Sequence, residues 1–141
     1  MSKWQHSGIS RKEALEILAS RKASLREEWK RNYLHIKEIL LSGSGESNRG
    51  DPVDQIRNDL QALTKKQQGC VKCLDKIVDA RKRIFYGSFG ICEACGEEIP
   101  LGRLQIRPES PVCAFCKTKQ EREENVIKHP TKTFFFPALA V

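Results

Sequence analysis

The sequence predicts a mainly α-helical protein, an antiparallel coiled-coil helical hairpin followed by a small four-cysteine module and a C-terminal helix. Three observations predict this fold class. Apolar residues recur at alternating steps of three and four along two long segments. A polar loop over residues 42–50 separates the segments, and four cysteines in two Cys-x2-Cys pairs follow the second one. The 141 residues suffice for one compact module with a long appendage.

The first helical segment begins at Ser10. Residues 1–9 have no periodicity and are expected to form a flexible lead-in. Ser10 and Glu13 have the spacing of a capping box, in which two side chains satisfy the free amides of a helix start. The predicted seam then consists of Leu15, Leu18, Leu25, Trp29, Ile36 and Ile39, with Lys22 and Asn32 filling the gaps.

The second segment follows the polar loop directly. Asp51 suits the N-cap, Pro52 the first helical position and Asp54 the third. Two heptad segments joined by a short loop fold back as an antiparallel hairpin over residues 10–86, with a tip loop over 42–54 and arms of about 45–50 Å. The predicted seam is Val53, Ile56, Leu60, Leu63, Gln67, Cys70, Leu74, Ile77, Arg81 and Ile84.

Four cysteines have the spacing of a structural zinc site. Cys92-x2-Cys95 is followed after 17 residues by Cys113-x2-Cys116, and two residues between ligands let one tight turn present both thiolates to a tetrahedral ion. Gly96 follows the second ligand, where the turn calls for a positive φ. Four protein ligands leave no open position for water, so we expect one structural Zn²⁺ in a zinc finger with a C-terminal helix over residues 87–128.

Two further features have more than one interpretation. Cys70 and Cys73 form another Cys-x2-Cys, but within the second helix. They are read as a seam residue and its half-exposed neighbour, and a redox pair or a second metal site is the alternative. Residues 129–141 form an apolar tail, and its Phe134–Val141 stretch is expected to fold back onto the protein because exposed phenylalanines associate.

The remaining composition excludes some function classes and leaves others open. No Ser/His/Asp array, phosphate-binding glycine loop or paired carboxylates can be recognised, which predicts that the chain is not an enzyme. No secretory signal follows Met1 and no apolar run could span a bilayer, which predicts a cytoplasmic protein with no membrane partner. The net charge of +7 permits a nucleic-acid partner, but Lys and Arg alternate with acids along both helices, as on a solvated coiled-coil face.

Residues 86–120 closely resemble the zinc-finger signature of the DksA/TraR family of transcription regulators, and with the heptads the resemblance covers residues 10–128. The loop-to-helix segment Asp51-Pro52-Val53-Asp54 is also similar to the acidic hairpin tip of that family. The matching finger elements are Tyr86-Gly87, Gly90-x-Cys92-x2-Cys95-Gly96, Ile99, Arg103-Leu104, Arg107-Pro108 and Cys113-x2-Cys116-Lys117.

The resemblance implies a regulator that binds RNA polymerase directly, without sequence-specific DNA binding. It implies a finger on the rim of the polymerase secondary channel and a hairpin tip near the active centre. Family members act with guanosine tetraphosphate in the stringent response, and the basic positions of that shared nucleotide site match Lys76, Arg107 and Lys117. We expect a monomer that uses RNA polymerase as its partner.

One departure from the family concerns the hairpin tip. The family tip reads Asp-x-x-Asp-x-Ala, and this chain has Ile56 in place of the small alanine. We therefore expect Asp54 to be the effector carboxylate and Asp51 the helix cap, with an output that differs from that of DksA itself. Three alternatives remain at this point: both aspartates act only as caps, the chain is a basic zinc-finger module that binds nucleic acid, or it is a coiled-coil adaptor for another protein.

Overall fold

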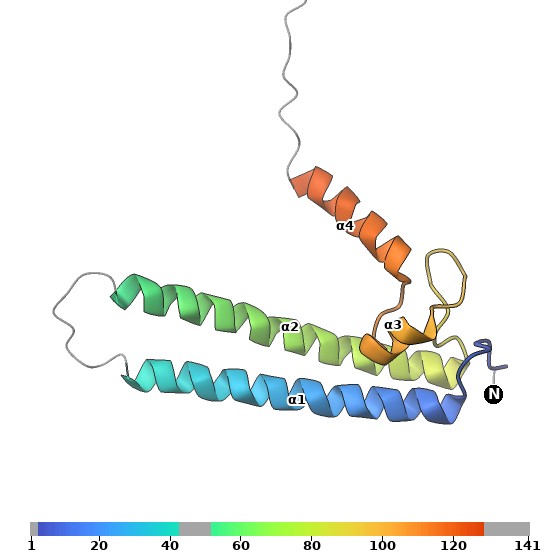
Figure 1. The fold of residues 1–141 in the computed structure, drawn as a ribbon, viewed down its shortest axis with the longest axis horizontal. Coiled ribbons are helices and arrows are strands. Elements are labelled where there is room, and N and C mark those ends of the chain that lie inside the picture. The colour runs from blue at the N-terminus through green and yellow to red at the C-terminus, as the bar shows by residue number, and fades with distance from the viewer. Residues whose placement is uncertain (1–2, 43–51, 129–141) are drawn as a thin grey trace, which may run out of the picture.

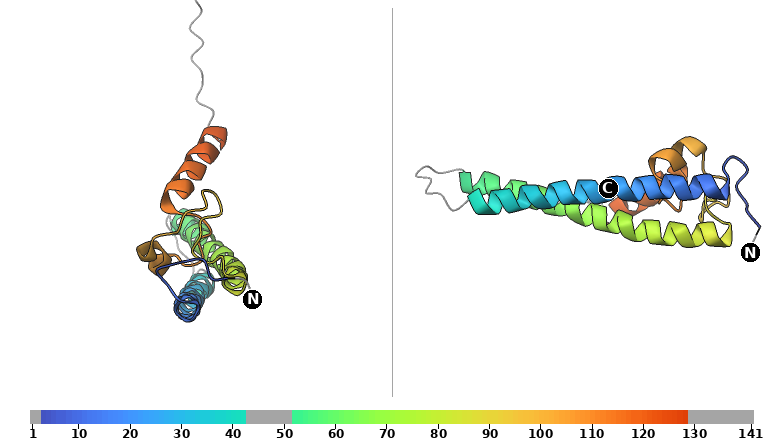
Figure 2. Two further views of the ribbon diagram at one scale, coloured as in Figure 1. Left: turned by 90° about the vertical axis from the view of Figure 1, so that its right-hand side faces the viewer. Right: turned by 90° about the horizontal axis from the view of Figure 1, so that it is seen from below.

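The computed structural model describes residues 3–42 and 52–128, and its dominant feature is a long hairpin of two antiparallel helices (Figure 1). Its elements are α1 (Arg11–Ser42), α2 (Pro52–Tyr86), α3 (Leu101–Ile106) and α4 (Ala114–Lys128). Figure 2 shows that α1 and α2 lie side by side along their length, and that α4 points away from them at the base. The predicted fold class is confirmed. None of the described helices has an apolar stretch that could cross a bilayer.

The seam between α1 and α2 follows the predicted heptads along most of the hairpin. Burial is deepest on the side of the finger and decreases toward the tip, where Ile36, Ile39 and Ile56 are half-buried. Two helices alone shield one stripe of side chains from water, so the core gains depth only where the finger adds a third wall. The seam residues buried as predicted are Leu18, Leu25, Leu63, Cys70, Ile77 and Ile84.

Near the base and at the start of α2 the seam differs from the prediction. Leu15, Lys22, Val53 and Arg81 are exposed. In three of these four cases the residue before the predicted one is shielded from solvent instead. These residues are Ala14, Arg21 and Ala80. Ala14 and Ala80 are completely buried, since side chains this small permit close packing where the helices meet the finger. Val53 belongs to the first turn of α2, where the hairpin offers little cover.

Both ends of the described hairpin base carry specific terminating structures. Ser10 N donates to Glu13 Oε2 at 2.8 Å and Glu13 N donates to Ser10 Oγ at 3.3 Å, which confirms the capping box. The hydrogen bonds that the Ser10 amide and hydroxyl donate to the Glu13 carboxylate lower the pKa of Glu13. At the end of α2, Gly87 N donates to Ile84 O at 3.2 Å and Ser88 N to Arg83 O at 2.9 Å. This is a Schellman motif, and it requires the positive φ of 81° at Gly87.

The expectation of a flexible lead-in is wrong for residues 3–9. His6 is buried, and its Nε2 lies 3.0 Å from Ile99 O while its Nδ1 accepts from Gly8 N at 3.1 Å. A carbonyl on one ring nitrogen and an amide on the other fix the neutral tautomer with the proton on Nε2. Ser7 adds hydrogen bonds of 2.8 and 2.7 Å to the Glu98 carboxylate. The contacts with Ile99 and Glu98 join residues more than 90 positions apart, so no local pattern could predict them.

The short helix α3 was also missed by the sequence pattern. Within the predicted finger over residues 87–128, only a C-terminal helix is expected, because the six residues of α3 are too few to display helical periodicity. Pro100 precedes α3, and Leu104 from its middle is fully buried beside Ile99 and Phe89 in the core cluster. The predicted C-terminal helix is present as α4.

Gly90 gives a test of the packing of the lead-in. A Cβ at this position would lie 2.6 Å from His6 Cδ2 and 3.2 Å from Leu104 Cδ1, at a φ of +79°. Gly90→Ala should destabilise the protein by about 2–5 kcal/mol, as the sum of left-handed strain and overpacking. Gly96→Ala is the matched control, because its φ is +75° but nothing lies within 4 Å of its Cβ. Thermal unfolding of both zinc-loaded variants should show a clearly larger loss for Gly90→Ala, and equal losses would contradict the close contact with His6.

Candidate metal centre and basic cavity

The first cysteine pair lies in a knuckle that is built by backbone hydrogen bonds. Cys92 N donates to Glu97 O at 2.8 Å, and Gly96 N donates to Cys92 O at 2.9 Å. The turn closes because Gly96 has a φ of 75°, which confirms the expected left-handed position. A single antiparallel bridge between Ile91 and Glu98 holds the base of the knuckle. This turn places the Cys92 and Cys95 side chains on one side.

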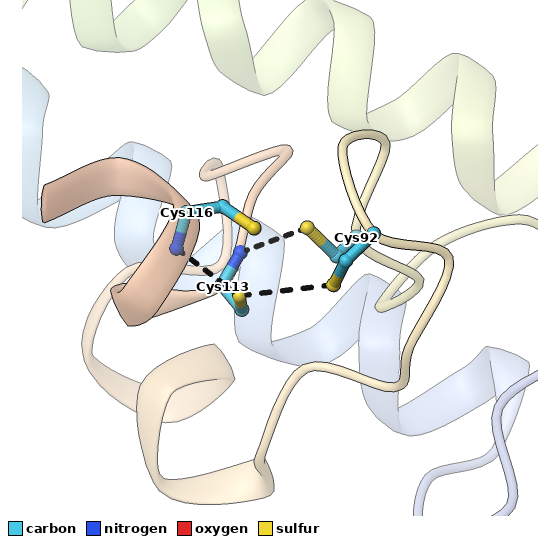
Figure 3. A group of neighbouring side chains, drawn as sticks. Cys92, Cys113 and Cys116 are labelled. Carbon is cyan, nitrogen blue, oxygen red and sulfur yellow. Dashed lines mark hydrogen bonds between the residues drawn. The ribbon is translucent and has the colours of Figure 1, made fainter. Parts of the chain in front are cut away.

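The second pair is placed by the start of α4. Lys117 N donates to Cys113 O at 3.0 Å, which begins the helix directly after the first ligand of the pair. Cys113 N donates to Cys92 Sγ at 3.3 Å and Cys116 N to Cys113 Sγ at 3.5 Å. The sulfur atoms of Cys92, Cys113 and Cys116 point toward one another (Figure 3). The two pairs therefore converge on one point.

The four sulfur atoms fit a zinc ion. All four Sγ atoms of Cys92, Cys95, Cys113 and Cys116 lie within 4.8 Å of one another. In a tetrahedral ZnS4 centre with bonds of about 2.3 Å, sulfur atoms are separated by about 3.8 Å. Cys95 and Cys113 already have sulfur atoms 4.0 Å apart. Small side-chain rotations would bring the set to the metal geometry, and two backbone amides directed at sulfur support thiolate charge.

The thiols of this cluster differ in acidity. Burial opposes ionisation of Cys92, but amides of Cys113, Cys95 and Ala94 more than offset it and lower its pKa to about 6. The Cys113 side chain, followed by burial, raises the pKa of Cys116 to about 12. One thiolate therefore forms readily and makes the next ionisation harder. A divalent cation removes this conflict, since it stabilises all four charges at once and displaces the protons.

Glu109 connects the finger to both helices of the hairpin, through an ion pair with α1 and a hydrogen bond from α2. Arg21 of α1 pairs with Glu109 at 3.3 Å, and the Glu109 side chain is only 3% exposed. Arg83 of α2 donates to the Glu109 carbonyl at 3.2 Å. Within the finger, Arg103 donates to Val112 O at 3.2 Å. No local pattern in the sequence marks Arg21, Arg83 or Glu109, because charged residues are abundant and these contacts join distant parts of the chain.

The three basic residues suggested by the family resemblance line one cavity of about 160 Å³. Lys76 comes from α2, Arg107 from the end of α3, and Lys117 from the first turn of α4. Arg103 and Glu109 also line it, as do Cys73, Ser110, Pro111, Val112 and Gln120. Convergence of cations from three elements is a geometry that can hold an anion.

The other singled-out cysteines lie outside the metal cluster. Cys70 is buried in the seam, as predicted, and burial together with Glu28 raises its pKa. Cys73 is half-buried at the cavity wall. Both are free thiols. Within residues 3–42 and 52–128, only the four cysteines of the finger form a group of three or more metal-ligand side chains close enough to share an ion.

Of the predicted tip loop over residues 42–54, the structure describes Ser42 and residues 52–54. Asp54 is exposed and forms an ion pair with Arg57 at 3.3 Å. Ile56 is half-buried in the seam, so it packs toward the hairpin instead of standing free at the tip. The predicted cap Asp51 and the tail Phe134–Val141 lie outside the described residues.

Comparison with known proteins identifies the family. Residues 87–122 match the model of the prokaryotic dksA/traR C4-type zinc finger. The RNA polymerase-binding transcription factor DksA of Escherichia coli strain K12 is 31% identical over 112 residues, which are 77% of this chain and 69% of that protein. The chain belongs to the DksA/TraR family. The similarly named protein of Caulobacter vibrioides is 32% identical, over 71% of this chain and 78% of its own length.

A solved structure shows that this DksA/TraR chain shares the fold of a relative. The transcription factor DksA2 of Pseudomonas aeruginosa superposes with a TM-score of 0.61 over 82% of this chain and 85% of the other, at 24% identity. The C4-type finger of the family model includes all four clustered cysteines. The predicted zinc ligands are thus supported both by geometry and by family membership.

Removal of one ligand tests the metal centre. Cys113→Ser should abolish stoichiometric zinc binding and lower the stability by about 4 kcal/mol or more, because loss of a structural metal belongs to the most damaging class of change. Native mass spectrometry and thermal unfolding measure both effects. Cys73→Ser is the control and should keep one zinc per chain. A Cys113→Ser protein that retains its zinc and its melting temperature would refute the assignment.

Proposed function

We propose that this chain is a transcription regulator that binds RNA polymerase directly and inserts its hairpin into the secondary channel. The observation that carries this proposal is the 31% identity to RNA polymerase-binding factors, which extends over 77% of the chain and therefore reaches beyond the finger into the hairpin. The proposal includes a monomer in the cytoplasm with no catalytic activity of its own.

The shape supports insertion tip first. α1 and α2 have 32 and 35 residues, which correspond to about 48 and 53 Å at 1.5 Å per residue. The hairpin is only two helices wide, while α3, α4 and the knuckle widen the base (Figure 1). A narrow channel can admit the tip but not the base. Asp54 would then be the described carboxylate that approaches a magnesium-bearing active centre.

The basic cavity supports a nucleotide ligand shared with polymerase. We propose that Lys76, Arg107 and Lys117 contact the phosphates of guanosine tetraphosphate, because polyphosphates are bound by several converging cations. The cavity is small, and it lies on the finger side of the hairpin. The remaining surface of the nucleotide would be covered by polymerase.

Direct polymerase binding can be tested against the nucleic-acid alternative that the charge of +7 favours. A zinc-loaded, affinity-tagged chain should enrich core polymerase from a nuclease-treated lysate at physiological salt, with Cys113→Ser as the control that lacks the finger. Binding to purified duplex DNA should be weak and should fall steeply with salt. Capture of DNA with no enrichment of polymerase after nuclease treatment would overturn the proposal.

The effector role of Asp54 has its own test. Asp54→Asn should bind polymerase as well as the parent but lose at least about tenfold of its effect on transcription, since the amide lacks the charge that a metal centre senses. The matched control is Asp59→Asn, which removes another exposed carboxylate from α2. Ile56→Ala should shift the output toward that of DksA. If Asp54→Asn acts like the parent but melts at a lower temperature, the residue is only a helix cap.

A further inference from the structure

The basic cavity contains one acidic side chain that does not fit an anion site. Glu109 lines the cavity together with Lys76, Arg103, Arg107 and Lys117, and it is the only carboxylate among the lining residues. Its side chain is 3% exposed, and its Oε2 is buried without a hydrogen-bond partner in the described structure. A buried carboxylate with a free oxygen repels any anion placed beside it and attracts nearby cations.

The cations available to Glu109 differ in how they are engaged. Arg103 is committed to Val112 O and Ser110 Oγ, and Lys117 pairs with Glu121 at 3.6 Å. The side chains of Lys76 and Arg107 have no hydrogen bond or ion pair within residues 3–42 and 52–128. These two side chains could form an ion pair either with an incoming anion or with the Glu109 carboxylate.

Arg21 is the ion-pair partner of Glu109. It approaches Glu109 from α1, at 3.3 Å from Oε1, and it does not line the cavity. Its own Nε is buried without a partner. The ion pair is therefore partly buried and imperfect, because one carboxylate oxygen and one guanidinium nitrogen are buried without a partner. Such a pair is a poor source of stability compared with apolar packing, which points to a function for its charges.

We propose that Arg21 is a positioning residue that neutralises Glu109 and holds it away from Lys76 and Arg107, so that the cavity can accept a polyphosphate. This inference rests on the proposed nucleotide site and adds a residue that raises the affinity of that site. With Arg21 in place, the carboxylate is drawn toward α1 and the free cations face the cavity. Without Arg21, the Glu109 carboxylate competes with the ligand for Lys76 and Arg107.

The two partners of the pair should therefore affect ligand affinity in opposite directions. Glu109→Gln keeps the shape and a hydrogen-bond acceptor for Arg21, removes the competing charge, and should tighten anion binding about threefold or more. Arg21→Gln frees the carboxylate and should weaken binding by a similar factor. In the double variant, the loss of Arg21 should have little further effect, because its target is gone. Arg21→Lys should restore most of the parent affinity.

The measurement is a calorimetric titration of inorganic pyrophosphate into each zinc-loaded chain at low salt. The same variants are then tested for the guanosine tetraphosphate concentration that gives a half-maximal effect on polymerase. Zinc content and thermal unfolding are measured for every variant, so a loss of fold is recognised. A merely structural pair predicts that both single variants lower stability and move affinity in the same direction.

The outcomes separate this inference from the proposal beneath it. Opposite shifts that vanish in the double variant support it. A parent that binds pyrophosphate while both single variants weaken binding overturns this inference alone, and so does an Arg21→Gln effect that persists when residue 109 is glutamine. A parent that neither binds pyrophosphate nor responds to guanosine tetraphosphate on polymerase overturns the nucleotide site and this inference together.

Discussion

The junction between the finger and the base of the hairpin is the constraint on which the rest of this structure depends. Two helices that pack along one seam bury too little apolar surface to hold their register firmly. The chain closes the base with contacts of very long sequence separation, from Arg21 to Glu109 and from His6 to Ile99. Loop-closure entropy is thus offset by a metal centre and a compact core, in which Phe89, Ile99 and Leu104 are almost completely buried.

This arrangement separates two kinds of surface. The base is compact, with hydrogen bonds that leave the knuckle a single geometry. The seam becomes less buried with distance from the base, since Leu18 and Leu25 are buried whereas Ile36 and Ile39 are only half-buried. A compact base with slender arms would suit the tip-first insertion proposed above. Packing alone therefore gives the two ends of the hairpin different surfaces.

The parts of this fold that the sequence predicted are those with local physical signals. Heptad spacing, the Ser10 capping box, Pro52 as the first helical residue and the positive φ of Gly96 each need only a few neighbouring residues. The four zinc ligands also follow from spacing, since each pair occupies one turn. The sequence did not predict the packing of the lead-in, the short helix α3 or the burial of Ala14 and Ala80 in place of their neighbours. Tertiary packing against the finger determines all three.

The residues of the basic cavity also include one that the sequence did not predict. Lys76, Arg107 and Lys117 were named from a family resemblance, and the structure brings all three to one cavity. Neither resemblance nor spacing pointed to Glu109, which stands between two prolines in a segment with no periodicity. Only the tertiary arrangement reveals that its carboxylate faces Arg21 across 88 residues of sequence. Charged residues that act through one partner leave no pattern in a single sequence.

The metal centre and the cavity are electrostatically linked by their shared segment. Lys117 follows the ligand Cys116, and the cavity residue Val112 precedes the ligand Cys113, so zinc binding fixes both structures at once. Four thiolates around Zn²⁺ carry a net charge of about −2, and this charge lies beside a wall with four cations. With zinc bound, this charge would reduce the mutual repulsion of Lys76, Arg103, Arg107 and Lys117. Besides holding the finger together, the zinc centre would therefore lower the electrostatic cost of gathering four cations at one cavity.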